Sequence, residues 1–383
     1  MNTQQPNLRT GALLLALVLS AFSSADSVAA DSDKSSGGWR LHGRFQLDGA
    51  QFDSNNPLFS DDTKIRRGRI SLSGELFDGL KVKMEYELTG STPGPKSMYI
   101  RRKFGKKLAV TAGHLKVPVS LQTATSSRYN TFMERALPNV GTTGYRLGIV
   151  AASYGKFWSA SGGFTGGGLD ENYNLDKDGS GFYGRFVLNP VRTKHDLLHF
   201  GVNTEVRYYG SSDSLRFRSR PESDLTDIRL VDTQRILDLD DSLRYTAEFA
   251  WKHDSVQFQA EYMKISMSRN IGLDLDFDGW YAQAGWFITG ESRKYNRRNG
   301  SFRRTNPDHA YGAWEIAVRH SELGLNSAEF LGGDETNDSL ALNYYATKSI
   351  RLSLNYIEAT ARPNTAGVDE DVSIIEARFQ FVF

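Results

Sequence analysis

The segment SLRFRSRP, residues 214–221, places arginines at every second position. Side chains on an extended chain alternate between two faces, so Arg216, Arg218 and Arg220 are predicted to lie on one side. A guanidinium stays charged at any relevant pH and donates paired hydrogen bonds to phosphate oxygens. Three such groups repel one another, and a bound anion would relieve the repulsion. The row therefore indicates a surface that attracts anions.

Further basic residues fall on the polar faces of predicted strands. KIRRGRIS carries Arg66 and Arg67, and LKVK carries Lys81 and Lys83 beside a short turn. The chain has 46 Lys and Arg residues against 45 Asp and Glu residues, a net charge of +1, so these groups are local concentrations in a balanced chain. Each one alone is most simply a solvated surface charge. The overall balance does not favour a nucleic-acid-binding protein.

The sequence offers little for catalysis or metal binding. It contains no cysteine, which excludes a disulfide, a thiolate metal site and a cysteine nucleophile. It has no G-x-S-x-G motif and no convincing His-Asp-Ser set. DLDFDG (274–279) begins like a calcium loop, but Gly285 stands where the bidentate Glu is required. We therefore predict no enzymatic activity, no cofactor and no metal.

The elements that carry these residues are predicted to be strands. LKVKMEYELT (80–89) alternates apolar and polar residues without a break, and about sixteen such segments, each of roughly ten residues, follow one another from Trp39 to Phe383. Short turns alternate with long polar loops, predicted at 51–64, 118–143, 165–179, 210–240 and 324–337. This pattern is typical of an all-β, 16-stranded antiparallel transmembrane β-barrel with short periplasmic turns and long external loops. The connection 289–311 is long although it falls on the short-turn side.

The two ends of the chain indicate export and closure of the sheet. An apolar run after Arg9 and the small residues before Asp31 predict a signal peptide at 1–30, which leaves 31–383 as one barrel domain. The last segment, IIEARFQFVF, would be an aggregation-prone edge unless it pairs with the first strand. Its terminal Phe383 resembles the signal read by the bacterial barrel-assembly machinery. We expect the protein in the bacterial outer membrane, surrounded by lipid and lipopolysaccharide.

Several stretches resemble the phosphate-selective porin family. They are IRRGRISLSGELFDGLKVKMEYELTG, GHLKVPVSLQTATSSRYNTFMERALPNV, SLRFRSRP, GWYAQAGWFITGE and GAWEIAVRHSEL, and together they run through essentially the whole mature chain. The resemblance implies a homotrimer whose third loop folds into each barrel and forms a constriction with the fifth loop. It also implies an arginine ladder of Arg66, Arg67, Arg216, Arg218 and Arg220, a basic third-loop residue at Arg128, and lysines such as Lys81 and Lys83 toward the periplasmic mouth.

One position departs from the family pattern. The family has a lysine just before ATSS, where this chain has Thr123. The resemblance places residue 123 near the narrowest point, so we expect a faster and less discriminating channel than one with the lysine. Lys116, seven residues earlier, is a candidate to compensate for the missing cation.

Two functional classes follow from these features. One is an outer-membrane channel for phosphate or other small anions, with Arg66, Arg67, Lys116, Thr123, Arg128, Arg216, Arg218 and Arg220 lining its path. The other is a barrel without steady conductance, whose loop arginines bind lipopolysaccharide phosphates at the cell surface.

Overall fold

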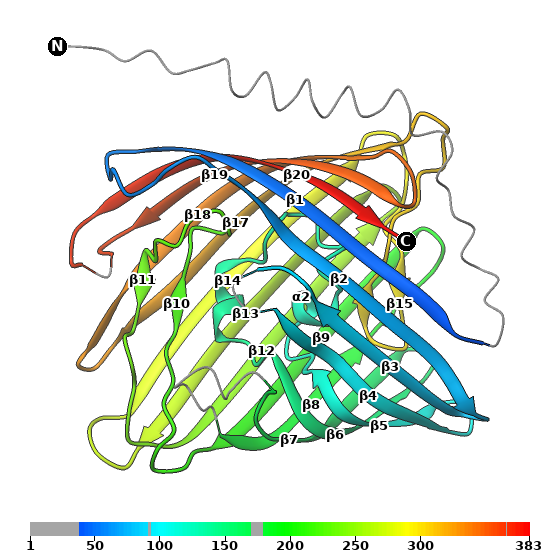
Figure 1. Cartoon of the computed structure of the whole chain (residues 1–383), viewed down its shortest axis with the longest axis horizontal. Coiled ribbons are helices and arrows are strands. Elements are labelled where there is room, and N and C mark those ends of the chain that lie inside the picture. The colour runs from blue at the N-terminus through cyan, green and yellow to red at the C-terminus, as the bar shows by residue number, and fades with distance from the viewer. Residues whose placement is uncertain (1–37, 91–92, 170–178, 365) are drawn as a thin grey trace.

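A closed antiparallel barrel of sixteen strands forms the body of the molecule. The computed structural model describes residues 38–90, 93–169, 179–364 and 366–383 (Figure 1). The predicted signal peptide, 1–30, lies outside them. In barrel order the strands are β1 (Arg40–Ser54), β2 (Asp62–Phe77), β3 (Leu80–Glu87), β4 (Gly94–Phe104), β5 (Leu108–Lys116), β6 (Tyr145–Tyr154), β7 (Trp158–Thr165), β8 (Ser180–Leu188), β9 (Asp196–Tyr208), β12 (Leu239–His253), β13 (Val256–Arg269), β14 (Leu275–Phe287), β17 (Ala313–Ser327), β18 (Phe330–Tyr345), β19 (Ile350–Ala361) and β20 (Glu370–Val382).

Alternation along each strand separates a polar interior from an apolar exterior. On β12, Arg244 and Glu248 are buried inside the barrel, whereas Leu243 and Tyr245 are exposed on the outside. Exposed apolar side chains of this kind recur around the wall and form the surface expected to face lipid. Among the described residues, no helix has the length and apolar character needed to cross a bilayer.

The last strand closes the barrel against the first, as the apolar C-terminal pattern predicts. β20 pairs with β1 over eleven residue pairs, from Arg44–Val382 to Ser54–Val372. Beyond the strand, Phe383 and Gly43 exchange two backbone hydrogen bonds of 3.1 and 3.2 Å. A Cβ atom on Gly43 would lie 2.1 Å from the ring of Phe383, so only glycine fits beneath that ring.

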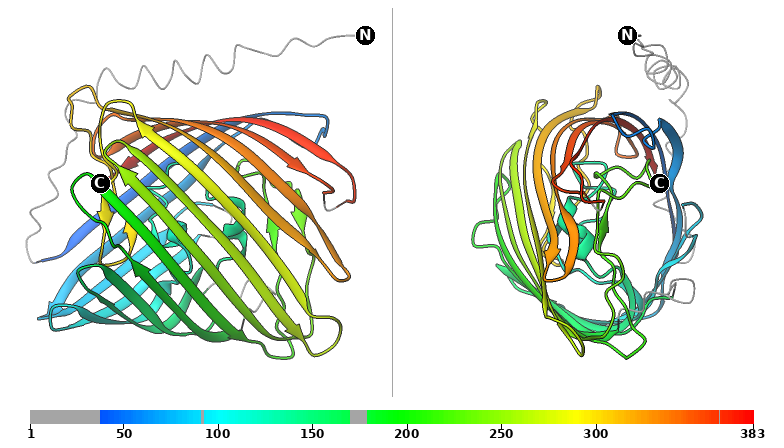
Figure 2. Two further views of the ribbon diagram at one scale, coloured as in Figure 1. Left: turned by 180° about the vertical axis from the view of Figure 1, so that it is seen from behind. Right: turned by 90° about the vertical axis from the view of Figure 1, so that its left-hand side faces the viewer.

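Two long loops fold into the barrel from the same end (Figures 1 and 2). Loop 3 (117–144) contains the short helices α2 (Leu121–Ala124) and η2 (Leu137–Gly141). Loop 5 (209–238) contains a two-stranded ribbon, β10 (Arg218–Ser219) and β11 (Val231–Asp232). Phe217 anchors this ribbon by packing with inward-facing wall residues such as Phe277 and Met263. Loop 3 therefore folds inward as the family resemblance implied.

The long connection on the short-turn side also folds inward, which explains its length. This inner connection (288–312) forms a small hairpin, β15 (Tyr295–Asn296) and β16 (Ser301–Phe302). Tyr295 and Phe302 pack with Leu121 of α2, and the Phe302 amide donates to the Thr125 hydroxyl at 3.2 Å. The connection thus supports loop 3 from the short-turn end of the barrel.

The predicted loop at 324–337 is wrong. β17 and β18 continue through most of it, and a turn at Ala328 and Glu329 joins them. Polar residues such as Asp334 lie on the outer face of β18, where the strand still has its antiparallel partner. Hydrophilic composition alone did not distinguish a long hairpin from a loop.

Candidate functional site

Loop 3 is fixed to one side of the barrel through its backbone carbonyls. Side chains of β17 to β20 donate to five of them, in the pairs Gln380–Arg128, Arg351–Asn130, Asn343–Thr131, Arg378–Met133 and Arg319–Glu134. The inner connection adds Arg293, which donates to the Tyr129 carbonyl at 3.0 Å. Phe132 packs against Ala317 and Ala341 on the same wall. The other side of loop 3 faces β1 and β2, from which Arg44 and Arg66 donate hydrogen bonds to it.

Six cations gather where loop 3 faces β1 and β2. We call this set the basic cluster: Arg44 of β1, Arg66, Arg67 and Arg69 of β2, Lys116 of β5 and Arg135 of loop 3. Their charges act on one another: Lys116 is repelled by Arg135, Arg69, Arg67 and Arg44. Four carboxylates pair directly with cluster members, those of Glu85, Glu87, Glu134 and Asp224. Cations therefore outnumber their carboxylate partners.

A β-bulge brings both Arg66 and Arg67 into the lumen. Gln46 of β1 pairs with Arg67 and Leu47 pairs with Ile65, so the register skips Arg66. Arg66 donates to both oxygens of Glu134 at 2.9 and 3.0 Å, and Arg67 donates to Gln46 at 3.0 Å. Regular alternation would have sent one of the two arginines outward. The structure thus brings together the two β2 arginines that the family resemblance implied.

Three members of the basic cluster have no carboxylate partner among the described residues. Arg44 donates to the Ser127 hydroxyl at 2.7 Å, and Lys116 donates to the Thr123 carbonyl at 2.8 Å. Arg135 donates to the Gln122 carbonyl at 3.1 Å. These direct partners are neutral, so the carboxylates of Glu85 and Glu134 compensate the charges only from a distance, and a mobile anion would balance the rest.

Glu134 holds the paired half of the cluster together. Burial alone raises the pKa of its carboxyl, but the guanidiniums of Arg66, Arg67 and Arg378 outweigh burial and hold the pKa well below its usual range. Burial lowers the pKa of Arg135 by more than the neighbouring Glu134 carboxylate raises it, and the cations Arg69 and Arg66 add to the lowering. The carboxylate of Glu134 therefore stays ionised between several arginines.

Thr123 is predicted to line the path near its narrowest point, but its hydroxyl is bonded within α2. Thr123 is the third residue of α2, and its hydroxyl accepts from the Ser120 amide at 2.8 Å. The Ser120 hydroxyl in turn accepts from the Thr123 amide at 3.1 Å, which completes a capping box. Only 5% of Thr123 is exposed. The short helix uses this hydroxyl, because its first backbone amides need acceptors.

The three loop-5 arginines share one face, opposite the anchoring Phe217, but only one of them forms no ion pair. Arg216 donates to both oxygens of Asp232 at 2.8 and 2.5 Å. Arg220 pairs with Asp224 and Asp227, each at 2.5 Å. Arg218 is exposed and makes no ion pair with any described residue. Aspartates of loop 5 therefore compensate the positive charge of two of the three arginines in the row.

A cavity of about 250 Å³ lies between loops 3 and 5. Arg218, Arg220, Arg229 and Arg135 line it, together with Glu134, Glu222 and Asp224. Burial lowers the pKa of Arg229 to about 10, and the charges of Arg220 and Arg218 contribute. Arg229 forms no ion pair among the described residues. The cavity connects the row of loop 5 with the basic cluster.

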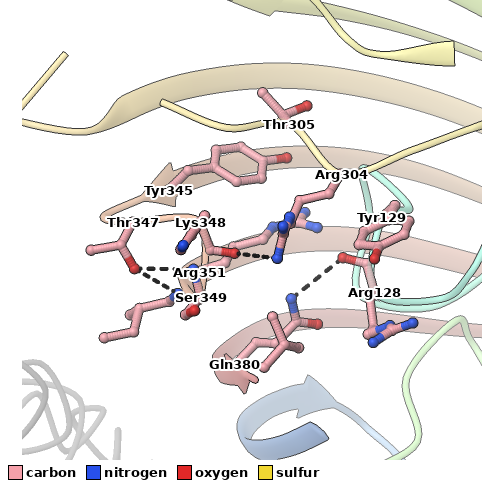
Figure 3. Close-up of a pocket in the computed structure, with 12 residues that line it drawn as sticks. Arg128, Tyr129, Arg304, Thr305, Tyr345, Thr347, Lys348, Ser349, Arg351 and Gln380 are labelled. Carbon is pink, nitrogen blue, oxygen red and sulfur yellow. Dashed lines mark hydrogen bonds between the residues drawn. The ribbon is translucent and has the colours of Figure 1, made fainter. Parts of the chain in front are cut away.

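Basic residues also lie on the short-turn side of loop 3. Lys81 and Lys83 lie on the inner face of β3 near its short turn, opposite Glu75 and Ser73. Arg128 sits 5.3 Å from the ring centre of Tyr129 and lines a small pocket of about 20 Å³ (Figure 3). The other cations around that pocket are Arg304, Lys348 and Arg351, and the described residues that line it include no carboxylate.

Sequence reasoning missed Arg44, Arg69, Arg135 and Arg229 as members of the site. Arg44 carried the clearest signal, because it stands on the polar face of the first predicted strand. Its register partner is Arg69, so the two cations face the lumen side by side. Arg135 and Arg229 lie in loops, where no period predicts the direction of a side chain.

The family comparison agrees with this geometry. A family model described as "Phosphate-selective porin O and P" matches residues 40–383. The chain belongs to this family. Porin O of Pseudomonas aeruginosa is 25% identical over 96% of the chain and 97% of its own length. An uncharacterised protein of Caulobacter vibrioides is 29% identical over 83% of the chain and 68% of its own length.

Solved porins share the fold of this phosphate-selective porin O and P family member at low identity. The anion-selective porin of Comamonas acidovorans has a TM-score of 0.56 and 12% identity over 90% of the chain and 99% of its own. The DcaP channel of Acinetobacter baumannii has a TM-score of 0.57 and 10% identity over 91% and 99%. OmpT of Vibrio cholerae, in its trimer form, has a TM-score of 0.56 and 10% identity over 90% and 99%. The protein is therefore a channel of the bacterial outer membrane.

Proposed function

We propose that this channel is selective for anions and binds phosphate or related oxyanions at the basic cluster. The observation that carries the proposal is the imbalance at the constriction, where Arg44, Lys116 and Arg135 have only neutral partners. Fixed charges around a narrow passage concentrate ions of opposite sign and exclude ions of like sign. Guanidinium groups also match the geometry of phosphate oxygens.

The path has three stages in this proposal. An anion first meets Arg218 and Arg229 in the cavity between loops 3 and 5. It then passes the basic cluster and leaves between Lys81 and Lys83 on one side and Arg128 on the other. Several moderate sites in series allow an anion to be handed over, whereas one deep site would trap it.

Three further features are proposed by analogy and position. The related OmpT structure is described as a trimer, which supports a homotrimer here. Residues 1–30 serve as the export signal, and Phe383 serves as the recognition residue for barrel assembly. Lipid and lipopolysaccharide contact the apolar exterior.

The surface-binding alternative gains no support from loop 5. Arg216 and Arg220 pair with aspartates of the same loop, and the ribbon of that loop packs inside the barrel. This position favours a role along the permeation path over contact with lipopolysaccharide phosphates.

A planar-bilayer recording tests the proposal. In a potassium chloride gradient, the reversal potential should have the sign of an anion-selective pore, and added phosphate should reduce the chloride current in a saturable way. A reversal potential of the cation-selective sign would contradict the proposal. The absence of any steady conductance step would favour the surface-binding alternative.

A further inference from the structure

The short-turn end of the barrel carries a strong excess of positive charge. The described connections at this end contain twelve Lys and Arg residues and four Asp and Glu residues. The described loops at the opposite end contain eight Lys and Arg residues and eleven Asp and Glu residues. Because the whole chain is nearly neutral, this excess is a property of one end, and it extends beyond the basic cluster.

Five of these cations lie on three connections that meet at Tyr154, and we call them the tip patch: Lys106, Lys107, Lys156, Arg297 and Arg298. Tyr154 lies at its centre. The guanidinium carbons of Arg297 and Arg298 are each 5.5 Å from the ring centre of Tyr154, and the Tyr154 hydroxyl donates to the Lys106 carbonyl at 3.1 Å. Three separate connections thus bring their cations together.

The tip patch is free to bind a partner. All five cations are exposed, and none of them forms an ion pair with another described residue. The inner connection that supplies Arg297 and Arg298 is held firmly on its other side, because Arg185 donates to the Asn299 and Gly300 carbonyls at 2.8 Å. A rigid support therefore presents unpaired charges to the periplasm.

We propose that the tip patch docks the barrel onto an anionic polymer of the periplasm, the peptidoglycan, through the carboxylates of its peptide stems. Repeated carboxylates complement five exposed cations that have no ion pair with the described residues, and two arginines already cover the ring of Tyr154 in the middle of the patch, which favours ionic contacts over an apolar anchor there. A polymer with regularly repeated carboxylates needs no such anchor. Many weak ionic contacts along it add up to stable retention. This docking does not depend on which ion the pore conducts.

Co-sedimentation of the full-length protein with purified peptidoglycan sacculi tests the proposal. At low salt the parent should sediment with sacculi, and salt should release it, because exposed ionic contacts are screened. The variant Lys106→Gln/Arg297→Gln/Arg298→Gln should bind at least about tenfold more weakly. The variant Lys96→Gln/Lys264→Gln/Arg362→Gln loses the same charge at the opposite end, and it should sediment like the parent.

A second arm uses only the parent protein. Sacculi whose carboxylates have been methyl-esterified should no longer bind it. Equal binding to native and esterified sacculi would overturn the proposal, and so would equal loss in the two triple variants. Failure of the parent to sediment at any salt concentration would also overturn it and would leave an acidic protein as the partner to examine.

Discussion

The arginines of loop 5 and the cations of the basic cluster are similar groups in different electrostatic surroundings. Arg216 and Arg220 belong to a loop that folds into the barrel, but aspartates of the same loop occupy their donors. The side-chain donors of Arg44, Lys116 and Arg135 have only hydroxyl or carbonyl acceptors among the described residues. The comparison shows that the carboxylate partners, more than the number of arginines, decide where an anion is needed to balance charge.

The largest effect is expected from Arg44→Gln in the uncompensated region. This change removes a cation whose only described partner is the Ser127 hydroxyl. A hydrogen bond to a charged group contributes ~1.5–3 kcal/mol, and ~1.4 kcal/mol corresponds to a factor of ten in affinity. The phosphate concentration that halves the chloride current should therefore rise about tenfold.

Arg40→Gln is the matched control for that experiment. Arg40 begins the same strand, is exposed and lies outside the cluster. Arg40→Gln should leave the phosphate concentration that halves the chloride current unchanged. If Arg44→Gln also left it unchanged, the basic cluster would not be the phosphate site.

A smaller effect is expected when the compensated and uncompensated arginines of loop 5 are compared. Arg218→Gln removes an exposed cation without an ion pair and should lower anion conductance at low salt by roughly twofold. The double variant Arg216→Gln/Asp232→Asn removes an ion pair at constant net charge and should conduct like the parent. At about 1 M salt the difference should vanish, because screening shortens to ~3 Å. An equal loss of anion conductance in both variants would mean that the ion pair with Asp232 does not prevent Arg216 from attracting anions.

The sequence predicted the parts of this molecule that depend on periodicity. Strict alternation in segments such as 80–89 gave the barrel, and the apolar C-terminal pattern gave the closing pair of β1 and β20. The common face of Arg216, Arg218 and Arg220 also followed from the period of two. These features depend on neighbours along the chain, so the sequence shows them directly.

The missed features depend on contacts between distant segments. The bulge at Arg66 is a property of two paired strands, and no pattern within β2 predicts it. Glu134 lies 68 residues from Arg66, so the pair could not be recognised before loop 3 was placed. The inward fold of the inner connection likewise depends on packing against α2.

The smallest effect on permeation is expected from Thr123→Lys. This variant tests whether residue 123 acts at the constriction or serves to cap a helix. The family resemblance implies that a channel with lysine at this position discriminates more strongly between anions. In the structure, the Thr123 hydroxyl belongs to the capping box, and lysine cannot replace its bond with the Ser120 amide. Loss of a capping interaction costs about 1 kcal/mol of stability. The new ammonium would also lie close to Lys116, whose Nζ donates to the Thr123 carbonyl. Thr123→Lys should therefore lower the thermal unfolding midpoint and change the half-blocking phosphate concentration by less than about twofold.

Thr123→Ser keeps the hydroxyl and should match the parent in both measurements. A tenfold tighter block by phosphate at unchanged stability would show that residue 123 faces the lumen and would place it among the uncompensated cations of the constriction.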